Sequence, residues 1–234
     1  MLLPGLMCDR AVWAPQIEAL APLAACHVMA YGTLDSLDAM AAHVLEQAPP
    51  GRFALAGHSM GGRVAFEVLR RAPERIERLA LLDTATHPLA AGEPGATEKA
   101  GRLRLLEIAR TEGMTAMARE WATGMVHPAH RDEPVFEAIV AMIARATPEI
   151  FAAQIKALLA RPDAAPLLAA IRCPTLVLCG RDDAWSPPAR HAFMHERIAG
   201  SRLVVIERCG HMSTMERPGE VTVALADWLQ AATA

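Results

Sequence analysis

The chain has 234 residues, of which 53% are hydrophobic and 21% charged, and its formal net charge at pH 7 is -3. This balance is typical of a folded globular protein and argues against nucleic acid and anionic membranes as partners. The sequence shows no bilayer-length apolar run and no signal-like leader, and its five cysteines lack Cys-x-x-Cys spacing. We therefore expect a cytoplasmic protein without a disulfide framework or a zinc site.

Short apolar runs alternate with helical patterns, which indicates parallel strands joined by crossover helices. In chain order we predict strands at 1–3, 25–30, 52–57, 78–83, 174–179 and 202–207, and helices at 10–21, 36–47, 60–71, 188–199 and 217–232. Most of these strands are apolar on both faces, so helices should cover both sides of the sheet. Asp9 and Asp35 are placed to cap the first two helices, and Pro218 suits the first turn of the last.

The alternation stops between Asp83 and Pro174, where helical patterns follow one another without an obvious strand. An all-helical insertion of this size between two strands of one sheet predicts a lid, which we place at residues 86–169. Residues 1–85 and 170–234 then form the core domain.

The sequence FALAGHSMGGRVAFEVL, at residues 53–69, places Ser59 between an apolar run and a helical pattern. Gly57 and Gly61 flank this serine, and glycine tolerates both positive φ and close backbone approach. A tight strand-to-helix turn can therefore hold Ser59 above the edge of the sheet, which makes it a candidate nucleophile.

A serine hydroxyl becomes a nucleophile when a histidine accepts its proton and a carboxylate fixes the tautomer of that histidine. Two other predicted strands end in residues of these kinds, since PTLVLCG is followed by RDDAWSP and RLVVIE by RCGHMS. His211 and either Asp182 or Asp183 then lie at the carboxyl ends of strands, which share one edge of a parallel sheet.

These segments, in this order and spacing, resemble the α/β-hydrolase fold over essentially the whole chain. The resemblance implies a three-layer α/β fold with a mostly parallel sheet and a helical lid. Relatives usually carry an antiparallel strand pair before the first loop, and this chain opens directly on that loop. We therefore expect about six strands, with the usual N-terminal pair missing.

The resemblance also implies a catalytic triad of Ser59, Asp183 and His211, in which Asp183 ends a Gly-x-x-Asp run. Two alternatives for the acid stay open. Asp182 is adjacent, and its other role would be to cap the loop. Asp83 ends the apolar run LALLD and, as in some relatives of this fold, can reach a histidine.

An oxyanion hole of two backbone N–H groups is implied in the same way. One N–H belongs to Met60, directly after the nucleophile, and we assign the other to Leu6 in the loop after the first strand. Many relatives begin this loop with His-Gly, whereas this chain has Pro4 and Gly5. Because the donor is a backbone group, the hole should survive that difference.

Large apolar side chains recur at helical spacing in the predicted lid, at Met114, Met117, Trp121 and Met125. We interpret this stripe as the apolar face of the lid against the core, and we expect Met117 and Trp121 also to contact substrate. Trp185 and Met212 closely follow the predicted acid and base and are further candidates for the pocket wall.

Four other histidines carry weaker signals. His127 and His130 precede two acidic residues but lack a third metal ligand, so we expect them in a lid loop. His191 and His195 lie four apart on a predicted helix without the glutamate of a zinc-protease motif, so we expect them on the surface.

The sequence predicts an enzyme, a serine hydrolase that cleaves small to medium carboxylic esters with an apolar group through an acyl-enzyme. Enol-lactone, thioester and carbon–carbon bond hydrolysis use the same triad and stay alternatives, because the fold does not choose among them. A non-catalytic binding protein of this fold is an alternative of another class, although such proteins commonly lose a triad member. No cofactor or metal is implied, the expected partner is a small ester-like molecule, and a homo-oligomer stays open.

Overall fold

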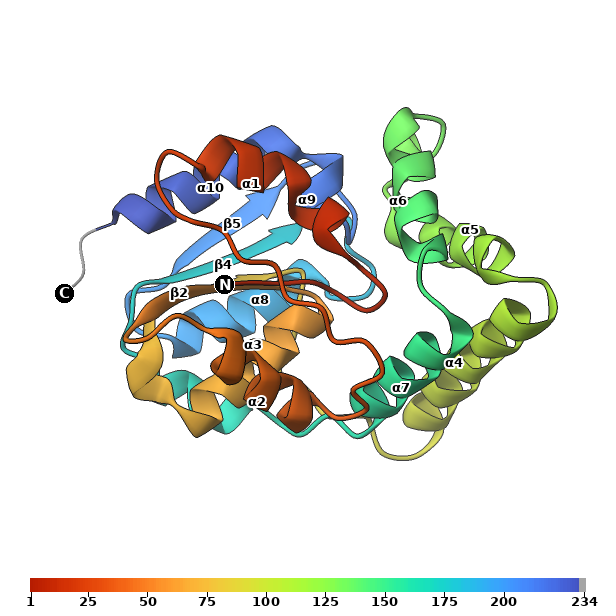
Figure 1. Cartoon of the computed structure of the whole chain (residues 1–234), viewed down its shortest axis with the longest axis horizontal. Coiled ribbons are helices and arrows are strands. Elements are labelled where there is room, and N and C mark those ends of the chain that lie inside the picture. Colours follow the sequence, from red (N-terminus) through yellow and green to blue (C-terminus); the bar gives the residue numbers. More distant parts are fainter. Residues whose placement is uncertain (232–234) are drawn as a thin grey trace.

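A parallel sheet forms the centre of the protein in the computed structural model, which describes residues 1–231 (Figure 1). Within this range the sheet has five strands in the spatial order β1-β2-β3-β4-β5, and every neighbouring pair is parallel. The strands are β1 (Leu2–Leu3), β2 (Phe53–His58), β3 (Ile76–Leu82), β4 (Thr175–Gly180) and β5 (Arg202–Ile206). Because all run the same way, their carboxyl ends meet at one edge.

The prediction of a strand at 25–30 is wrong for most of its length. This segment forms a single bridge, between Val28 and Leu2, at the edge of the sheet. The Leu2 N–H donates to His27 O at 2.7 Å, and the Met29 N–H donates to Leu2 O at 3.0 Å. Since β1 is two residues long, it offers no partner for a longer ladder, and the described residues contain five strands rather than six.

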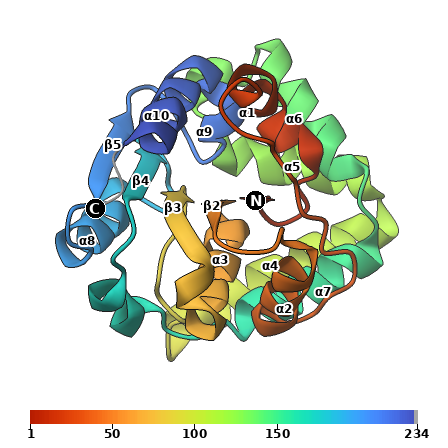
Figure 2. The ribbon, with the colours of Figure 1, turned by 60° about the vertical axis from the view of Figure 1, so that its left-hand side comes forward.

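Helices cover both faces of the sheet, which confirms the three-layer prediction (Figures 1 and 2). On one face lie α1 (Ala14–Leu20) and α10 (Pro218–Gln230), and on the other lie α2 (Leu37–Gln47), α3 (Met60–Arg71) and α8 (Pro188–Arg197). A short helix, α9 (Ser213–Glu216), precedes α10. The central strands are buried almost throughout, which explains their unbroken apolar sequences.

The helix ends agree with the sequence in part. The Asp9 carboxylate accepts the Ala11 N–H at 2.8 Å and caps the 3-10 helix Arg10–Trp13 that leads into α1. Pro218 is the first residue of α10, as expected; residue 232 of that predicted helix lies outside the described residues. The expected cap at Asp35 is wrong, because Ser36 caps α2 and the Asp35 carboxylate pairs with Lys156.

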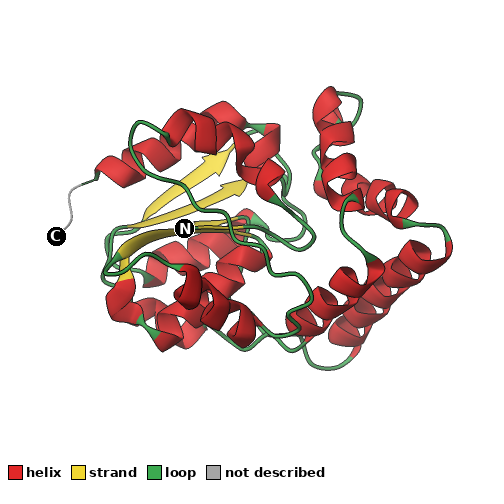
Figure 3. Cartoon of the chain, in the orientation of Figure 1, coloured by secondary structure: helices red, strands yellow, loops and turns green. Residues whose placement is uncertain are grey.

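Four helices lie between β3 and β4 in an insertion that, within the described residues, contains no strand (Figure 3). We call residues 86–169 the helical insertion. It holds α4 (Glu93–Thr111), α5 (Met114–Met125), α6 (Pro134–Ala144) and α7 (Pro148–Leu159). In Figure 1 this insertion lies beyond the arrowheads of the strands, so it faces the edge where their carboxyl ends meet. None of the helices in residues 1–231 has the length and apolar character to cross a bilayer.

Candidate active site

Ser59 occupies a sharp turn between β2 and α3, where the sheet meets the helical insertion. Its backbone φ of 55° is positive, which costs a non-glycine residue roughly 1–3 kcal/mol and persists only where the surroundings fix it. The Ser59 N–H donates to Leu82 O at 2.8 Å, and the Ser59 carbonyl accepts the Thr84 hydroxyl at 2.7 Å. These bonds hold the strained turn and present the serine side chain at the edge of the sheet.

Close backbone approach explains the glycines beside the serine. A Cβ added to Gly61 would lie 2.1 Å from Leu3 O, and one added to Gly57 would lie 2.4 Å from Gly61 O. Only glycine lets α3 begin this close to the strands. The predicted strand, turn and helix are therefore all present.

The structure brings Ser59, His211 and Asp183 into one chain of hydrogen bonds. Ser59 Oγ lies 2.8 Å from His211 Nε2, and His211 Nδ1 lies 2.8 Å from Asp183 Oδ2. Asp183 comes from the loop after β4 and His211 from the loop after β5, so three separate segments supply the three groups.

The surroundings of Asp183 favour its ionised form. Its second oxygen accepts the N–H groups of Trp185 and Ser186, each at 2.9 Å. Burial by itself raises the pKa of Asp183, but His211 and these two donors outweigh burial and hold the pKa below its ordinary value. An ionised carboxylate only accepts hydrogen bonds, so neutral His211 carries its proton on Nδ1 and leaves Nε2 free to accept from Ser59.

The charge of Asp183 also acts on His211. Burial lowers the pKa of this imidazole, whereas the negative charge of Asp183 and the hydrogen bond to it raise the pKa by more. The net result is a pKa above the ordinary histidine value. An imidazole in this position can take a proton from Ser59 and hold it as a stabilised cation.

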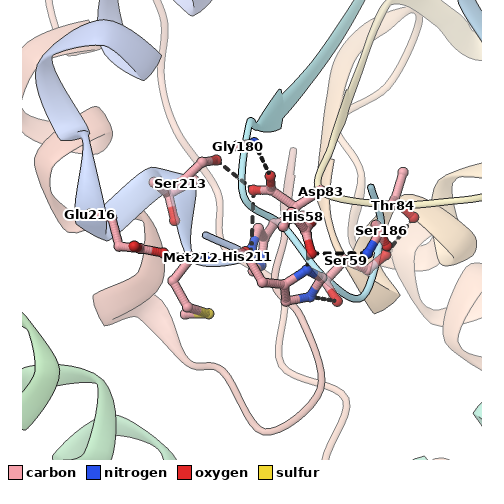
Figure 4. A network of polar contacts seen from close by, with 12 residues as sticks. His58, Ser59, Asp83, Thr84, Gly180, Ser186, His211, Met212, Ser213 and Glu216 are labelled. Atoms are coloured by element: carbon pink, nitrogen blue, oxygen red, sulfur yellow. Dashed lines mark hydrogen bonds and ion pairs between the residues drawn. The ribbon is translucent and has the colours of Figure 1, made fainter. Parts of the chain in front are cut away.

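Asp83, one of the alternative acids, is fully buried beside the triad (Figure 4). Its carboxylate accepts the Gly180 N–H at 3.1 Å and the Ser213 hydroxyl at 2.5 Å. Burial and the negative charge of Asp183 raise the pKa of Asp83 well above its ordinary value. Asp83 therefore links the end of β3 to the end of β4 and to the start of α9 through these hydrogen bonds.

Asp182, the other alternative, lies at the surface. Its side chain is 45% exposed, and its carboxylate is 3.5 Å from Nε2 of His127. Within residues 1–231, Asp183 is the acid whose carboxylate forms a hydrogen bond with His211.

The peptide unit of His211 is held on both sides. The His211 N–H donates to Met125 O, at the end of α5, at 2.7 Å. The His211 carbonyl accepts from Nε2 of His58 at 2.9 Å, and burial together with the nearby His211 lowers the pKa of His58 to about 4. His58 is therefore neutral and positions the backbone of the candidate base, a role that its sequence position did not reveal.

Glu216 is a second residue that sequence analysis missed (Figure 4). Its buried carboxylate accepts the N–H groups of Met212 at 3.0 Å, Gly210 at 3.1 Å and His127 at 2.8 Å. It closes the loop that carries His211 and ties that loop to the helical insertion. The available signal, a glutamate five residues after the histidine, is too common in sequences to be informative.

The loop after β1 packs directly on the nucleophile. A Cβ added to Gly5 would lie 3.2 Å from the Cβ of Ser59. In the described part of the chain, neither the Leu6 N–H nor the Met60 N–H has a hydrogen-bond partner, and Met60 has none within α3 because it is the first residue of that helix. Gln154 of α7 accepts the Met7 N–H at 2.9 Å, which fixes this loop against the insertion.

Two cavities meet at Ser59. The smaller has a volume of about 50 Å³ and is lined mainly by apolar side chains, including Leu6, Met125, Ile143 and Met212. The larger has a volume of about 510 Å³ and extends between α3, α4 and α8. Both are bounded by Trp121 and Trp185, whose rings stack with centroids 5.5 Å apart.

The predicted pocket residues fall into two groups. Trp121, Trp185 and Met212 line the cavities, and the Trp185 ring centroid lies 5.0 Å from that of His211. Met117 lines neither cavity, because its side chain is fully buried inside the helical insertion. Its part of the apolar stripe packs the insertion and leaves no surface for a ligand.

His130 and His191 have hydrogen-bond partners inside the protein. His130 contacts Glu133 at 2.8 Å and the Arg208 carbonyl at 3.0 Å. The expectation of a surface position is wrong for His191, which is fully buried and accepts the Thr84 N–H at 3.1 Å. Burial lowers the pKa of His191 to about 4, so it supports the loop after β3 as a neutral group.

The sheet, the turn at Ser59 and the placement of the helical insertion define a hydrolase-type α/β protein. The chain belongs to the alpha/beta hydrolase family, whose model matches residues 1–225.

Individual relatives agree with this assignment. A pimeloyl-[acyl-carrier protein] methyl ester esterase of Nitrosomonas europaea is 28% identical over 231 residues, which cover 93% of this chain and 90% of the relative. Among solved structures, a malate-bound esterase from Thermogutta terrifontis is 34% identical with a TM-score of 0.84, covering 98% of this chain and 88% of that one. An enol-lactonase from Burkholderia xenovorans is 27% identical with a TM-score of 0.81, covering 98% and 91%.

Proposed function

We propose that this protein is a serine hydrolase that cleaves carboxylic esters of small molecules through an acyl-enzyme. The observation that carries the proposal is the chain of two 2.8 Å hydrogen bonds from Ser59 through His211 to Asp183. Esterases and an enol-lactonase among the similar proteins support it, because they share this fold over nearly the whole chain.

In the first half of the reaction, His211 Nε2 takes the Ser59 proton as the hydroxyl attacks the ester carbonyl. Asp183 stabilises the imidazolium that forms, and it keeps the ring oriented through Nδ1. The negative charge that develops on the carbonyl oxygen is bound by the Met60 and Leu6 N–H groups. Such donors contribute on the order of 3 kcal/mol each in enzymes where one has been removed.

The first half ends when His211 gives its proton to the leaving alcohol and the acyl-enzyme forms. In the second half, His211 takes a proton from a water that attacks the acyl-enzyme, and returns that proton to Ser59 as the acid is released. The helical insertion, residues 86–169, acts as a lid over residues 1–85 and 170–234. It closes the cavities through Trp121 and supplies the Met125 carbonyl that holds the base.

The proposal is tested by labelling with a fluorophosphonate probe and by turnover of p-nitrophenyl esters. We expect the wild-type protein to be labelled at Ser59 and Ser59→Ala to lose both labelling and turnover. Ser201→Ala is a matched control, because Ser201 lies just before β5, contacts His195 and lines neither cavity. Undiminished labelling of Ser59→Ala would remove this serine from the mechanism.

Enol-lactone hydrolysis is the second candidate, favoured by the enol-lactonase of similar structure. It uses the same groups, so the choice depends on the cavity rather than on the triad. A comparison of kcat/KM across matched esters, enol-lactones, thioesters and carbon–carbon bond substrates distinguishes these reactions. A protein that binds but turns over none of them is the non-catalytic alternative.

A further inference from the structure

The larger cavity beside Ser59 carries an excess of positive charge. Its lining includes five arginines against two glutamates: Arg63, Arg102, Arg104, Arg161 and Arg190, with Glu98 and Glu120. The chain as a whole has a net charge of -3, so this excess of three positive charges is local. A purely apolar substrate gives no reason for it, because burying unpaired charge against apolar groups is unfavourable.

Three of these arginines form salt bridges within the lining, two of them with the same glutamate. Glu98 of α4 pairs with Arg161 at 2.7 Å and with Arg102 at 2.9 Å. Arg104 pairs with Glu120 across α4 and α5. These salt bridges join parts of the helical insertion to one another, which accounts for the presence of both glutamates in the lining.

Arg63 and Arg190 are the two arginines of the lining that take part in none of these salt bridges. Within residues 1–231 neither has a carboxylate partner, and the Arg63 guanidinium donates to the His87 carbonyl at 2.8 Å. Burial and the positive charges of Arg161, Arg190 and Arg102 lower the pKa of Arg63 to about 9. A half-buried guanidinium among other cations is in an environment that a bound anion would improve.

The position of Arg63 relates this charge to the nucleophile. Arg63 lies in the first turn of α3, four residues after Ser59, and both residues line the larger cavity. Arg190 lies in the first turn of α8, which also borders the cavity. Because Ser59 and both arginines line this one cavity, a ligand that contacts all three must extend through it.

We propose that Arg63 and Arg190 form an anion-binding subsite, and that the preferred ester carries a carboxylate or phosphate on the part that occupies the larger cavity. This inference rests on the serine hydrolase function proposed above. Guanidinium groups bind the paired oxygens of either anion bidentately. The smaller apolar cavity, of about 50 Å³, leaves room for a compact group on the other side of the scissile bond.

The test compares esters that differ in terminal charge. Monomethyl esters of diacids with four to eight carbons, and methyl esters of ω-phosphorylated acids, are each paired with a neutral methyl ester of equal length. Hydrolysis is followed in a pH-stat at low ionic strength. At one or more lengths we expect kcat/KM for an anionic ester to exceed that for its neutral partner at least tenfold, and the faster anion identifies the group.

Variants assign this preference to residues. In Arg63→Gln and Arg190→Gln we expect the anionic-to-neutral ratio of kcat/KM to fall roughly tenfold to hundredfold, the range for loss of a charge-assisted hydrogen bond. Arg63→Lys should keep part of the ratio. Arg110→Gln is the control, because Arg110 is exposed on α4 and lines neither cavity. If Arg63→Gln does not fold by circular dichroism, Arg190→Gln and Arg63→Lys carry the test.

Failure of the anion-binding subsite and failure of the hydrolase proposal give different results. Equal kcat/KM for anionic and neutral esters at every length, or a ratio unchanged in both Gln variants, overturns the subsite and leaves the hydrolase intact. Hydrolysis of the same esters by Ser59→Ala at the wild-type rate overturns the hydrolase proposal itself.

Discussion

Replacement of Asp183 by asparagine tests the tautomer of His211 directly. In the wild type, Asp183 Oδ1 accepts two backbone N–H groups at 2.9 Å, and Oδ2 faces His211 Nδ1. In Asp183→Asn, the amide oxygen would keep the two N–H bonds, which directs the NH2 group at Nδ1. Nδ1 must then accept, so the proton moves to Nε2 and the ring can no longer accept the proton of Ser59.

The size of the effect follows from these bonds. Turning the amide over would restore the tautomer but leave two buried N–H groups facing an NH2 group. A buried donor without a partner costs about 1–3 kcal/mol, so the turned state lies about 2–6 kcal/mol higher. At about 1.4 kcal/mol per factor of ten, we expect kcat to fall roughly 30-fold to 10⁴-fold. A loss of about 10⁴ is known for the same change in a serine protease triad.

The assay is kcat for a p-nitrophenyl ester, with unfolding curves for each variant. Asp182→Asn is the matched control and should change kcat less than about threefold, because Asp182 lies at the surface next to His127. Asp83→Asn tests the third carboxyl; burial and the charge of Asp183 raise the pKa of Asp83 well above its ordinary value, so this site should tolerate a neutral amide better than Asp183 does. A kcat for Asp183→Asn within a few-fold of the wild type, with a large loss in either other variant, would refute the assignment.

Two further predictions concern the surroundings of the base. Only neutral His211 can accept the Ser59 proton, and Asp183 raises the pKa of His211 by more than burial lowers it. We therefore expect kcat/KM to fall as the pH drops through a value above 6.5. A plateau of kcat/KM that extends well below pH 6 would contradict this. Glu216→Gln places an NH2 group opposite a buried backbone N–H in place of an acceptor oxygen. We expect this variant to have a lower kcat and a free energy of unfolding that is smaller by about 1–3 kcal/mol. Glu220→Gln, at an exposed position, should change neither quantity.

The candidate triad could be predicted because its chemistry depends on residue types at strand ends. Glycines around Ser59 indicate a close backbone approach, and parallel strands bring their carboxyl ends to one edge whatever lies between them. His211 and either Asp182 or Asp183 could therefore be placed beside Ser59 from the strand ends, and the choice of Asp183 came from the resemblance to α/β hydrolases. The same reasoning placed helices on both faces, because apolar runs buried on both sides need two layers of cover.

Other features depend on partners that are distant in the sequence. Residues 25–30 have a strand-like composition, but a strand also needs a partner of matching length, and β1 supplies two residues. Ser36 rather than Asp35 caps α2 because the helix begins at Leu37, and Asp35 instead pairs with Lys156 of α7. The arginines of the larger cavity are scattered from residue 63 to residue 190, so their common position is visible only after folding.

The helical insertion is part of the site's framework as well as its cover. Three of its bonds to the loops of the sheet join the Met125 carbonyl to the His211 N–H, the Gln154 side chain to the Met7 N–H, and the His127 N–H to Glu216. In each of these bonds at least one partner is a backbone group, and none of the three uses a cavity-facing side chain of the insertion. Substitutions of side chains such as Trp121 and Arg102 should therefore change the cavity while His211 and the loop after β1 keep their positions, so the proposed hydrolase could change its substrate without a change in the triad.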